Sequence, residues 1–198
     1  MALDPNIPLR YQNPKREDHD ALADLAKRFP EFVHLDETKM REILAQVAHD
    51  RLEFAARQVA FAKALVATKP GDEDMANREA IIAAYDALHH TLRAQHIAFQ
   101  GWDPIGHQET LDATKALFDD NGDLGHRYEW MNLGKSLPDA ANDIRTQRQA
   151  AEWDVYNREE DGKPRVDFAA EAPKAIRVAE ETVRTVRAAL YDRLAGEV

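Results

Sequence analysis

The sequence predicts an all-α fold: a helical bundle of about five to six helices built around a long antiparallel helical hairpin, with an extended N-terminal arm. Three observations favour it. Apolar residues recur at three- and four-residue steps along most of the chain. No segment shows the alternation of apolar and polar residues that is typical of a half-buried strand. The 8 glycines among 198 residues are also few for a strand-rich or loop-rich fold.

The N-terminal segment differs in composition from the rest of the chain. Residues 1–17 contain three prolines separated by polar residues, and each proline fixes φ and removes a backbone donor. We therefore expect an extended arm over residues 1–17 and a single helical domain over residues 18–198. That domain begins with a short helix over about residues 20–29, which Pro30 ends.

Residues 36–100 predict a long helical hairpin. One helix is expected over about residues 36–68 and the next over 72–100, joined at the turn-forming dipeptide Pro70-Gly71. At 1.5 Å per residue the hairpin is about 40 Å long, and it places residue i opposite about residue 141 − i. Alanine is dense in the first helix and permits close helix packing. The apolar stripe of the second helix contains Met75, Ile81, Tyr85, Leu88, Leu92 and Phe99, with His96 on the same stripe.

Further helices are expected in the C-terminal half. A short one covers about residues 107–118, and the C-terminal helices cover residues 138–195. The first of these runs over about 138–159, with Ser136 as its cap before a proline at the first helical position. The last runs over about 173–195 and has the most regular heptad-like stripe in the chain.

Composition excludes several classes of protein. The chain has 0 cysteines, which excludes a disulfide framework, a thiolate zinc site, an iron–sulfur cluster and a cysteine nucleophile. Its 36 acidic residues against 26 lysines and arginines give a net charge of −10, which opposes binding to nucleic acids and to anionic membranes. No apolar run approaches the roughly 20 residues of a membrane span, and residues 1–13 lack a signal-peptide core. We therefore expect a soluble, cytoplasmic chain.

Histidine placement suggests one alternative, a helical-bundle enzyme that binds a metal. His49 and Glu53 share a helix face, and the hairpin register brings them toward His89 and His96. Imidazole and carboxylate suit zinc or iron. However, His89 and His96 are roughly 10 Å apart along the helix axis, which is too far for one ion to bind both. We therefore expect no cofactor and no metal, and keep these four residues as the candidates that a metal site would use.

Two other motifs fall short of their patterns. The run Asp119–Gly125 matches the alternating oxygens that start a calcium loop, but Trp130 stands at the twelfth position, where calcium needs a bidentate carboxylate. The run Gly134-Lys135-Ser136 lacks both the earlier glycine and the strand of a phosphate-binding loop. No catalytic residue is predicted.

Partner contacts are predicted in two places. Tyrosine, tryptophan and arginine are over-represented at interface hot spots, and they occur just after the helices expected over residues 72–100 and 107–118. A heptad-like stripe also favours oligomerisation through the last helix. The predicted contact residues are Trp102, Arg127, Tyr128 and Trp130 in the aromatic segments, and Ile176, Val183 and Leu190 on the last helix.

One stretch carries a resemblance to a known group. Residues 1–9, MALDPNIPL, followed by Pro14 and the Ala/Leu-rich run Ala21–Lys27, resemble the opening of many tailed-bacteriophage proteins. The resemblance covers about 30 of 198 residues. It implies a phage origin, with a role and location in the virion or its assembly, and it implies no catalytic residue.

These observations lead to one functional hypothesis with two alternatives. We expect a non-enzymatic helical structural or interaction protein that self-associates or joins a larger assembly; in phage terms it is a virion, connector-like or assembly-accessory component. The first alternative is the metal-binding enzyme. The second is a small acidic inhibitor or regulator that occupies the nucleic-acid site of a basic partner.

Overall fold

A computed structural model describes residues 37–100, 104, 106–120, 136–153 and 166–195. Every regular element in these ranges is an α-helix, which confirms the predicted all-α fold. The helices are α2 (Glu37–Thr68), α3 (Glu73–Gln100), α4 (His107–Asp120), α6 (Leu137–Trp153) and α7 (Phe168–Ala195). The predicted arm, the helix over residues 20–29 and the end of the helix expected to reach residue 159 lie outside the described residues.

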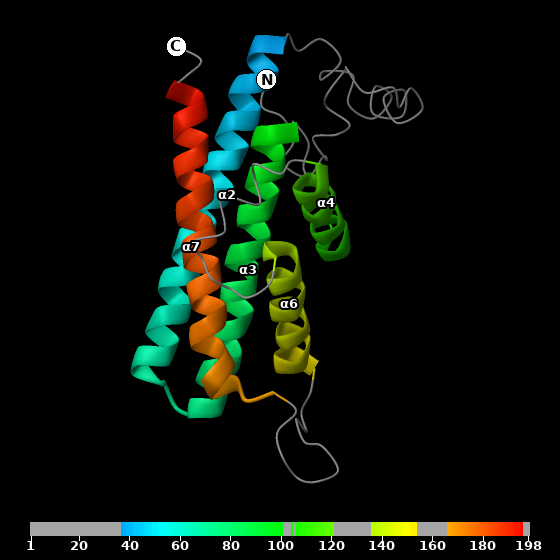
Figure 1. The fold of residues 1–198 in the computed structure, drawn as a ribbon. Coiled ribbons are helices and arrows are strands. Elements are labelled where there is room, and N and C mark those ends of the chain that lie inside the picture. Colours follow the sequence, from blue (N-terminus) through cyan, green and yellow to red (C-terminus); the bar gives the residue numbers. More distant parts are fainter. Residues whose placement is uncertain (1–36, 101–103, 105, 121–135, 154–165, 196–198) are drawn as a thin grey trace, which may run out of the picture.

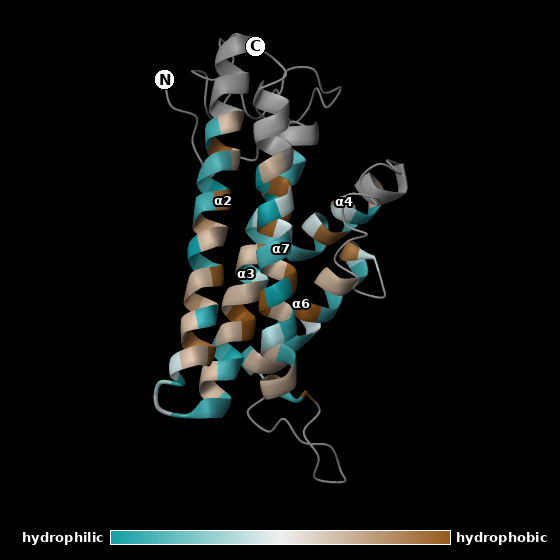
Figure 2. Ribbon diagram, turned by 60° about the vertical axis from the view of Figure 1, so that its left-hand side comes forward, coloured by the Kyte–Doolittle hydropathy of each residue, from teal (hydrophilic) through white to brown (hydrophobic). Residues whose placement is uncertain are grey.

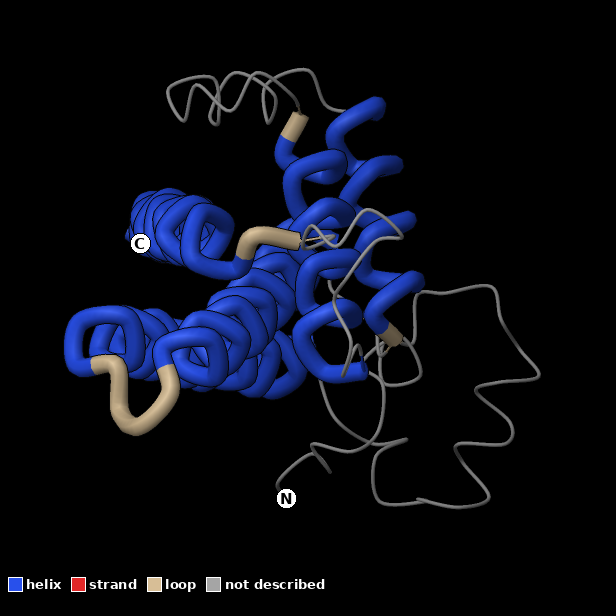
Figure 3. Tube along the Cα trace, turned by 90° about the horizontal axis from the view of Figure 1, so that it is seen from below, coloured by secondary structure: helices blue, strands red, loops and turns tan. Residues whose placement is uncertain are grey.

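Helix α3 is the centre of the bundle. It packs against α2, α4, α6 and α7. The long helices α2 and α7 lie on one side of it, and the shorter α4 and α6 lie on the other (Figures 1 and 3). Because neighbours surround it, α3 buries polar as well as apolar side chains along its length. Hydrophilic and hydrophobic segments alternate along the outer helices α2 and α7 in Figure 2.

Helices α2 and α3 form the predicted antiparallel hairpin. The chain leaves α2 through Lys69, whose φ of 43° lies in the left-handed region, and turns at Gly71, where φ is 80°. Glycine adopts such angles without the steric cost that a Cβ imposes. Asp72 then caps α3, because its Oδ1 accepts from the backbone N–H of Asp74 at 2.9 Å.

The register of the hairpin also agrees with the prediction. Nη1 of Arg51 on α2 lies 3.2 Å from Nδ1 of His90 on α3, which fits the pairing of residue i with about 141 − i. In this register, buried alanines that recur every seven residues on α2 face a matching series on α3. Small side chains let two backbones approach closely, so this series sets the spacing of the hairpin. The two series are Ala48, Ala55 and Ala62 on α2, and Ala80, Ala87 and Ala94 on α3.

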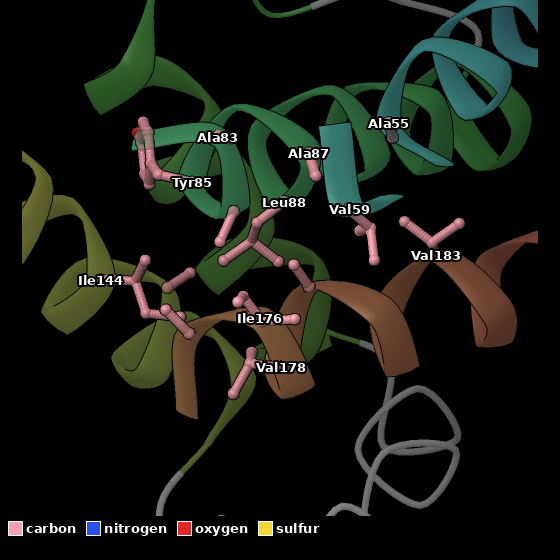
Figure 4. Packing of buried hydrophobic residues seen from close by; sticks show 14 of the residues in the cluster. Ala55, Val59, Ala83, Tyr85, Ala87, Leu88, Ile144, Ile176, Val178 and Val183 are labelled. Atoms are coloured by element: carbon pink, nitrogen blue, oxygen red, sulfur yellow. The ribbon is translucent and has the colours of Figure 1, made fainter. Parts of the chain in front are cut away.

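Helix α7 packs against both helices of the hairpin and runs antiparallel to α2. Lys63 pairs with Glu180, and Arg187 donates to Glu53 at 2.6 Å, so the two helices run in opposite directions. The four-helix core lies where α2, α3, α6 and α7 meet (Figure 4). The side chains labelled there include Val59 from α2, Leu88 from α3, Ile144 from α6, and Ile176 and Val183 from α7.

The start of α7 corrects the sequence prediction. The helix begins at Phe168, five residues before Pro173, which the sequence suggested as the helix start. Asp167 is the reason, because its Oδ1 accepts from the N–H of Ala170 at 3.1 Å and its carbonyl accepts from Glu171 at 2.9 Å. Pro173 is exposed, so the one helical donor that it lacks is lost on the solvent side.

The cap of α6 is confirmed. Ser136 stands immediately before the helix, and its Oγ accepts from the N–H of Asp139 at 3.3 Å. The Ser136 hydroxyl in turn donates to the Asp139 carboxylate at 2.6 Å. Ser136 therefore satisfies a backbone donor that the first turn of a helix leaves without an internal partner.

Candidate functional site

A group of polar and aromatic side chains lies where α3, α4 and α6 meet. Tyr85 and His89 come from α3, His107 is the first residue of α4, and Arg148 comes from α6. Tyr85 is 1% exposed and His89 is 6% exposed. We call these four residues the tyrosine–histidine cluster.

The cluster is held by a direct hydrogen bond and by ring contacts. The Tyr85 hydroxyl lies 3.1 Å from Nδ1 of His107. The His107 ring lies 4.4 Å from the His89 ring, between centroids, and Tyr85 and His89 stack at 6.1 Å with an interplanar angle of 12°. The guanidinium carbon of Arg148 lies 5.5 Å from the centre of the Tyr85 ring, on the geometry of a cation–π contact.

Helix spacing explains how these residues meet. Tyr85 and His89 are four residues apart, so they lie one turn apart on the same face of α3. Helix α4 runs parallel to α3, because His107 meets Tyr85 and Thr114 meets His96 further along both helices. Helix α6 runs antiparallel to α3, since Arg148 lies over Tyr85 while Arg78 reaches the carbonyl of Ala151.

Burial keeps the two α3 side chains of the cluster neutral. Desolvation raises the pKa of Tyr85 to about 12, although Arg145 and Arg148 act in the opposite direction. Desolvation lowers the pKa of His89 to about 2, and the positive charges of the neighbouring histidines and of Arg93 and Arg51 act in the same direction. At neutral pH the phenol keeps its proton and the imidazole carries no charge.

Burial and nearby charges also shift the pKa values of the more exposed His107 and Asp86. Desolvation is also the main cause that lowers the pKa of His107, followed by the charges of Arg148 and Arg145, while Glu152 opposes the shift. Desolvation raises the pKa of the neighbouring Asp86, against the attraction of Arg148. Because the Tyr85 phenol is protonated, it can donate its hydrogen to Nδ1 of a neutral His107.

The cluster extends toward α2 through His90. The guanidinium of Arg51 donates to Nδ1 of His90 at 3.2 Å, and the Phe54 ring lies 4.5 Å from the His90 ring. An arginine has no acceptor, so His90 accepts at Nδ1 and is neutral in this arrangement. The His90 and His89 rings are 5.7 Å apart, and the polar contacts therefore form a continuous path from α2 across α3 to α4.

A second polar contact joins α3 to α4. Nε2 of His96 lies 3.1 Å from Oγ1 of Thr114, and that hydroxyl donates to the carbonyl of Thr110 at 2.7 Å. The hydroxyl has one hydrogen, which goes to Thr110, so it accepts from His96 and fixes the Nε2–H tautomer. Both His96 and Thr114 are buried, and the bond is shielded from water.

The four candidate metal ligands do not come together. His49 is exposed beside Asp50, with 3.6 Å between Nδ1 and Oδ1, and Glu53 pairs with Arg187 of α7. His89 belongs to the tyrosine–histidine cluster, and His96 bonds to Thr114. Among the residues that the structure describes, no group of three histidine, cysteine, aspartate or glutamate side chains has the geometry to hold a metal ion.

The structure describes the side chains of only two of the predicted partner-contact residues. The structure places Ile176 and Val183 in the core of the bundle, where they pack against other helices of the same chain. A partner can reach these two side chains only if α7 leaves the bundle, so the prediction of an oligomer surface there is not supported at these positions. The residues Trp102, Arg127, Tyr128 and Trp130 and the side chain of Leu190 lie outside what the structure describes.

Sequence reasoning missed the tyrosine–histidine cluster and the large apolar side chains that reach solvent. Tyr85 and His89 were visible as neighbours on one face of α3, but nothing in the sequence pairs them with His107. Met75, predicted to lie on the apolar stripe of α3, is 57% exposed because it lies in the first turn of that helix, at the end of the bundle. Phe61 and Trp153 are also exposed, at 52% and 78%.

The chemistry of the cluster is that of a closed structural contact. A general base works best with a pKa near the working pH, and the pKa of His89 is far below it.

Among the helices that the structure describes, no stretch combines the length and the apolar composition of a membrane span. Comparison of the chain with family models, with curated proteins and with solved structures finds no match.

Proposed function

We propose that this chain is a non-enzymatic helical interaction protein that self-associates through protein–protein contacts, as a component of a virion or of its assembly. The resemblance of the N-terminal segment to tailed-bacteriophage proteins supports the setting. The bundle supports the mode of action, because the polar groups of the tyrosine–histidine cluster are committed to contacts between helices.

The observation that carries this proposal is the exposure of Trp153, the last described residue of α6. Its 78% exposure leaves most of a large aromatic side chain in water on a bundle that buries most of its other large apolar groups. Tryptophan is among the residues most enriched at interface hot spots. Phe61 is a second exposed aromatic. Its helix, α2, lies on the other side of α3 from α6 (Figures 1 and 3).

Two separate apolar contact points suit a subunit that meets neighbours on more than one side. Isolated apolar side chains are common on protein surfaces and each adds little alone. In a repeated assembly the same two contacts recur at every subunit, so weak individual contacts add up. Copies of the chain repel one another because each carries a net charge of −10. We therefore expect association to strengthen as added salt screens that repulsion.

Multi-angle light scattering of the full chain over a range of protein and salt concentrations tests the proposal. We expect an oligomer that weakens in Trp153→Gln and in Phe61→Gln and that strengthens with salt. Gln149→Ala, an exposed polar change on α6, is the matched control and leaves the mass unchanged. A chain that stays monomeric at every concentration, or an oligomer that both variants leave intact, contradicts self-association through these residues.

A version that lacks residues 1–14 tests the contribution of the arm separately. If the arm lies across neighbouring subunits, as the assembly hypothesis expects, the shortened chain associates more weakly than the full one. Equal association of both versions shows that the arm contributes nothing to the contact.

A further inference from the structure

We propose that helix α4 is an acid-released element of this bundle: protonation of the His107 imidazole breaks its contact with Tyr85 and frees α4 from α3 and α6. The inference concerns regulation of the fold and does not depend on the proposed function. It depends on how α4 is attached and on which charges surround His107.

Polar contacts dominate the attachment of α4 over residues 107–116, the part of the helix whose side chains the structure describes. Among the side chains described in this helix, Leu111 is the only large apolar one that is buried, and its other buried side chains are threonines. The contacts to neighbouring helices include Tyr85 with His107, His96 with Thr114, and Arg145 of α6 with Gln108. Helix α6, by comparison, buries Leu137, Ile144 and several alanines. Elements with little apolar burial open at the lowest free-energy cost.

The charges around His107 oppose a proton on its ring. Arg145 and Arg148 face it from α6, and Arg93 faces it from α3. Glu152 is the acidic group that favours the proton, and it is committed to Arg148, with 2.6 Å between Oε1 and Nη2. Arg51 from α2 adds positive charge around the adjoining His89 ring, and burial raises the pKa of Asp86.

A proton at Nδ1 also removes the acceptor that the Tyr85 hydroxyl uses. The phenol oxygen can then accept from the new N–H only if its own hydrogen rotates away and loses this acceptor, and the charged ring stays 4.4 Å from His89. Release of α4 relieves both conflicts, because the imidazolium reaches water. The pKa of His107 in the docked helix is lowered, so protons bind more tightly to the released form.

The difference in the pKa of His107 between docked and released α4 decides how docking depends on pH. Docking is fully favourable above the ordinary histidine pKa of about 6.5 and weakens as pH falls below it. For each histidine that takes up a proton only on release, the ratio of released to docked helix approaches a tenfold increase per pH unit. The surface uncovered on α3 would include the side chains of Tyr85, His89 and His96.

Hydrogen exchange of the full chain, followed by mass spectrometry between pH 7.5 and 5 and corrected for the intrinsic pH dependence of exchange, tests the inference. We expect protection over residues 107–120 to fall with pH toward tenfold per unit below pH 6.5, while the α2–α3 hairpin keeps its protection. His107→Gln keeps a hydrogen-bonding group at this position without a titrating one, and we expect a shallower pH dependence confined to α4. His49→Gln, on the exposed face of α2, is the matched control and keeps the wild-type profile.

A second variant tests the charge effect without changing His107 itself, because the glutamine at position 107 can also alter packing. Arg145→Gln removes a charge that opposes the proton and also the contact with Gln108. We therefore expect lower protection of α4 at pH 7.5 and a smaller further loss as pH falls than in the wild-type chain. The inference is overturned if α4 loses protection only together with α2 and α3, if its corrected protection is independent of pH, or if both variants keep the wild-type slope.

Discussion

The hydroxyl of Tyr85 lies 3.1 Å from Nδ1 of His107, and this bond joins the central helix α3 to the first residue of α4. Tyr85 is buried and its pKa is raised to about 12 by desolvation, so the phenol has its proton available to donate. The same tyrosine ring lies beneath Arg148 of α6. One side chain therefore connects three helices.

Removing the hydroxyl measures the strength of that connection. Tyr85→Phe keeps the ring and its packing but deletes the hydrogen bond, and we expect a loss of about 1 kcal/mol in the free energy of unfolding. A double-mutant cycle with His107→Leu isolates the contact. Urea denaturation of the four proteins should give a coupling free energy of about 1 kcal/mol, and additive losses would show that the two groups do not interact.

Acid is expected to destabilise the fold through His89. Its pKa is lowered to about 2 in the folded chain, against about 6.5 in an unfolded one, so the unfolded state binds more protons below pH 6.5. The stabilising contribution is complete above pH 6.5 and declines as pH falls, by about 2 kcal/mol at pH 5. Urea unfolding at pH 7 and pH 5 measures it, and His89→Gln should lose correspondingly less stability than the wild-type chain. Equal losses in both proteins would exclude His89 as the source.

The alanine series between α2 and α3 predicts intolerance to larger side chains. Ala55 and Ala87 are fully buried in the hairpin, and a leucine at either position forces the helices apart. We expect Ala55→Leu and Ala87→Leu each to lower the free energy of unfolding by about 1–3 kcal/mol. Ala60→Leu on the exposed side of α2 serves as control and should change it by less than about 0.5 kcal/mol. Tolerance of leucine at both buried positions would contradict the close approach of these helices.

The cap of α6 gives a local test. Ser136→Ala removes the hydroxyl that accepts from the Asp139 N–H, and we expect a loss of about 1 kcal/mol. Thermal denaturation followed by circular dichroism measures the loss, and Ser136→Asp should restore most of the stability because aspartate is also a favourable cap. An unchanged melting temperature in Ser136→Ala would show that the contact contributes nothing to stability.

The hairpin was predictable because its signals are local. A turn dipeptide between two long periodic segments fixes both the antiparallel pairing and its approximate register, which the contact between Arg51 and His90 confirms. The start of α7 was placed too late because Pro173 was interpreted as the first helical residue. The cap at Asp167 lies six residues before Pro173, and an exposed proline near a helix start costs little.

The tyrosine–histidine cluster was not predictable, for a different physical reason. Periodicity tells which face of a helix is apolar but not which helices become neighbours. The contact of His107 with Tyr85 depends on α4 folding back parallel to α3, and the segment between the two helices does not specify that direction. The burial of Gln95 and Thr91 has the same origin, because four neighbouring helices cover most of α3 and leave few exposed positions for polar groups.

Burial and neighbouring arginines keep the histidines of the tyrosine–histidine cluster neutral. Nuclear magnetic resonance titration of the labelled full chain tests it directly, with the His89 and His107 signals assigned through their glutamine variants. We predict that His89 stays neutral throughout the range from pH 7.5 to 5.5 while α4 is docked, and that His107 reaches half-protonation below pH 6.5. Half-protonation of either ring at pH 6.5 or above would contradict the account.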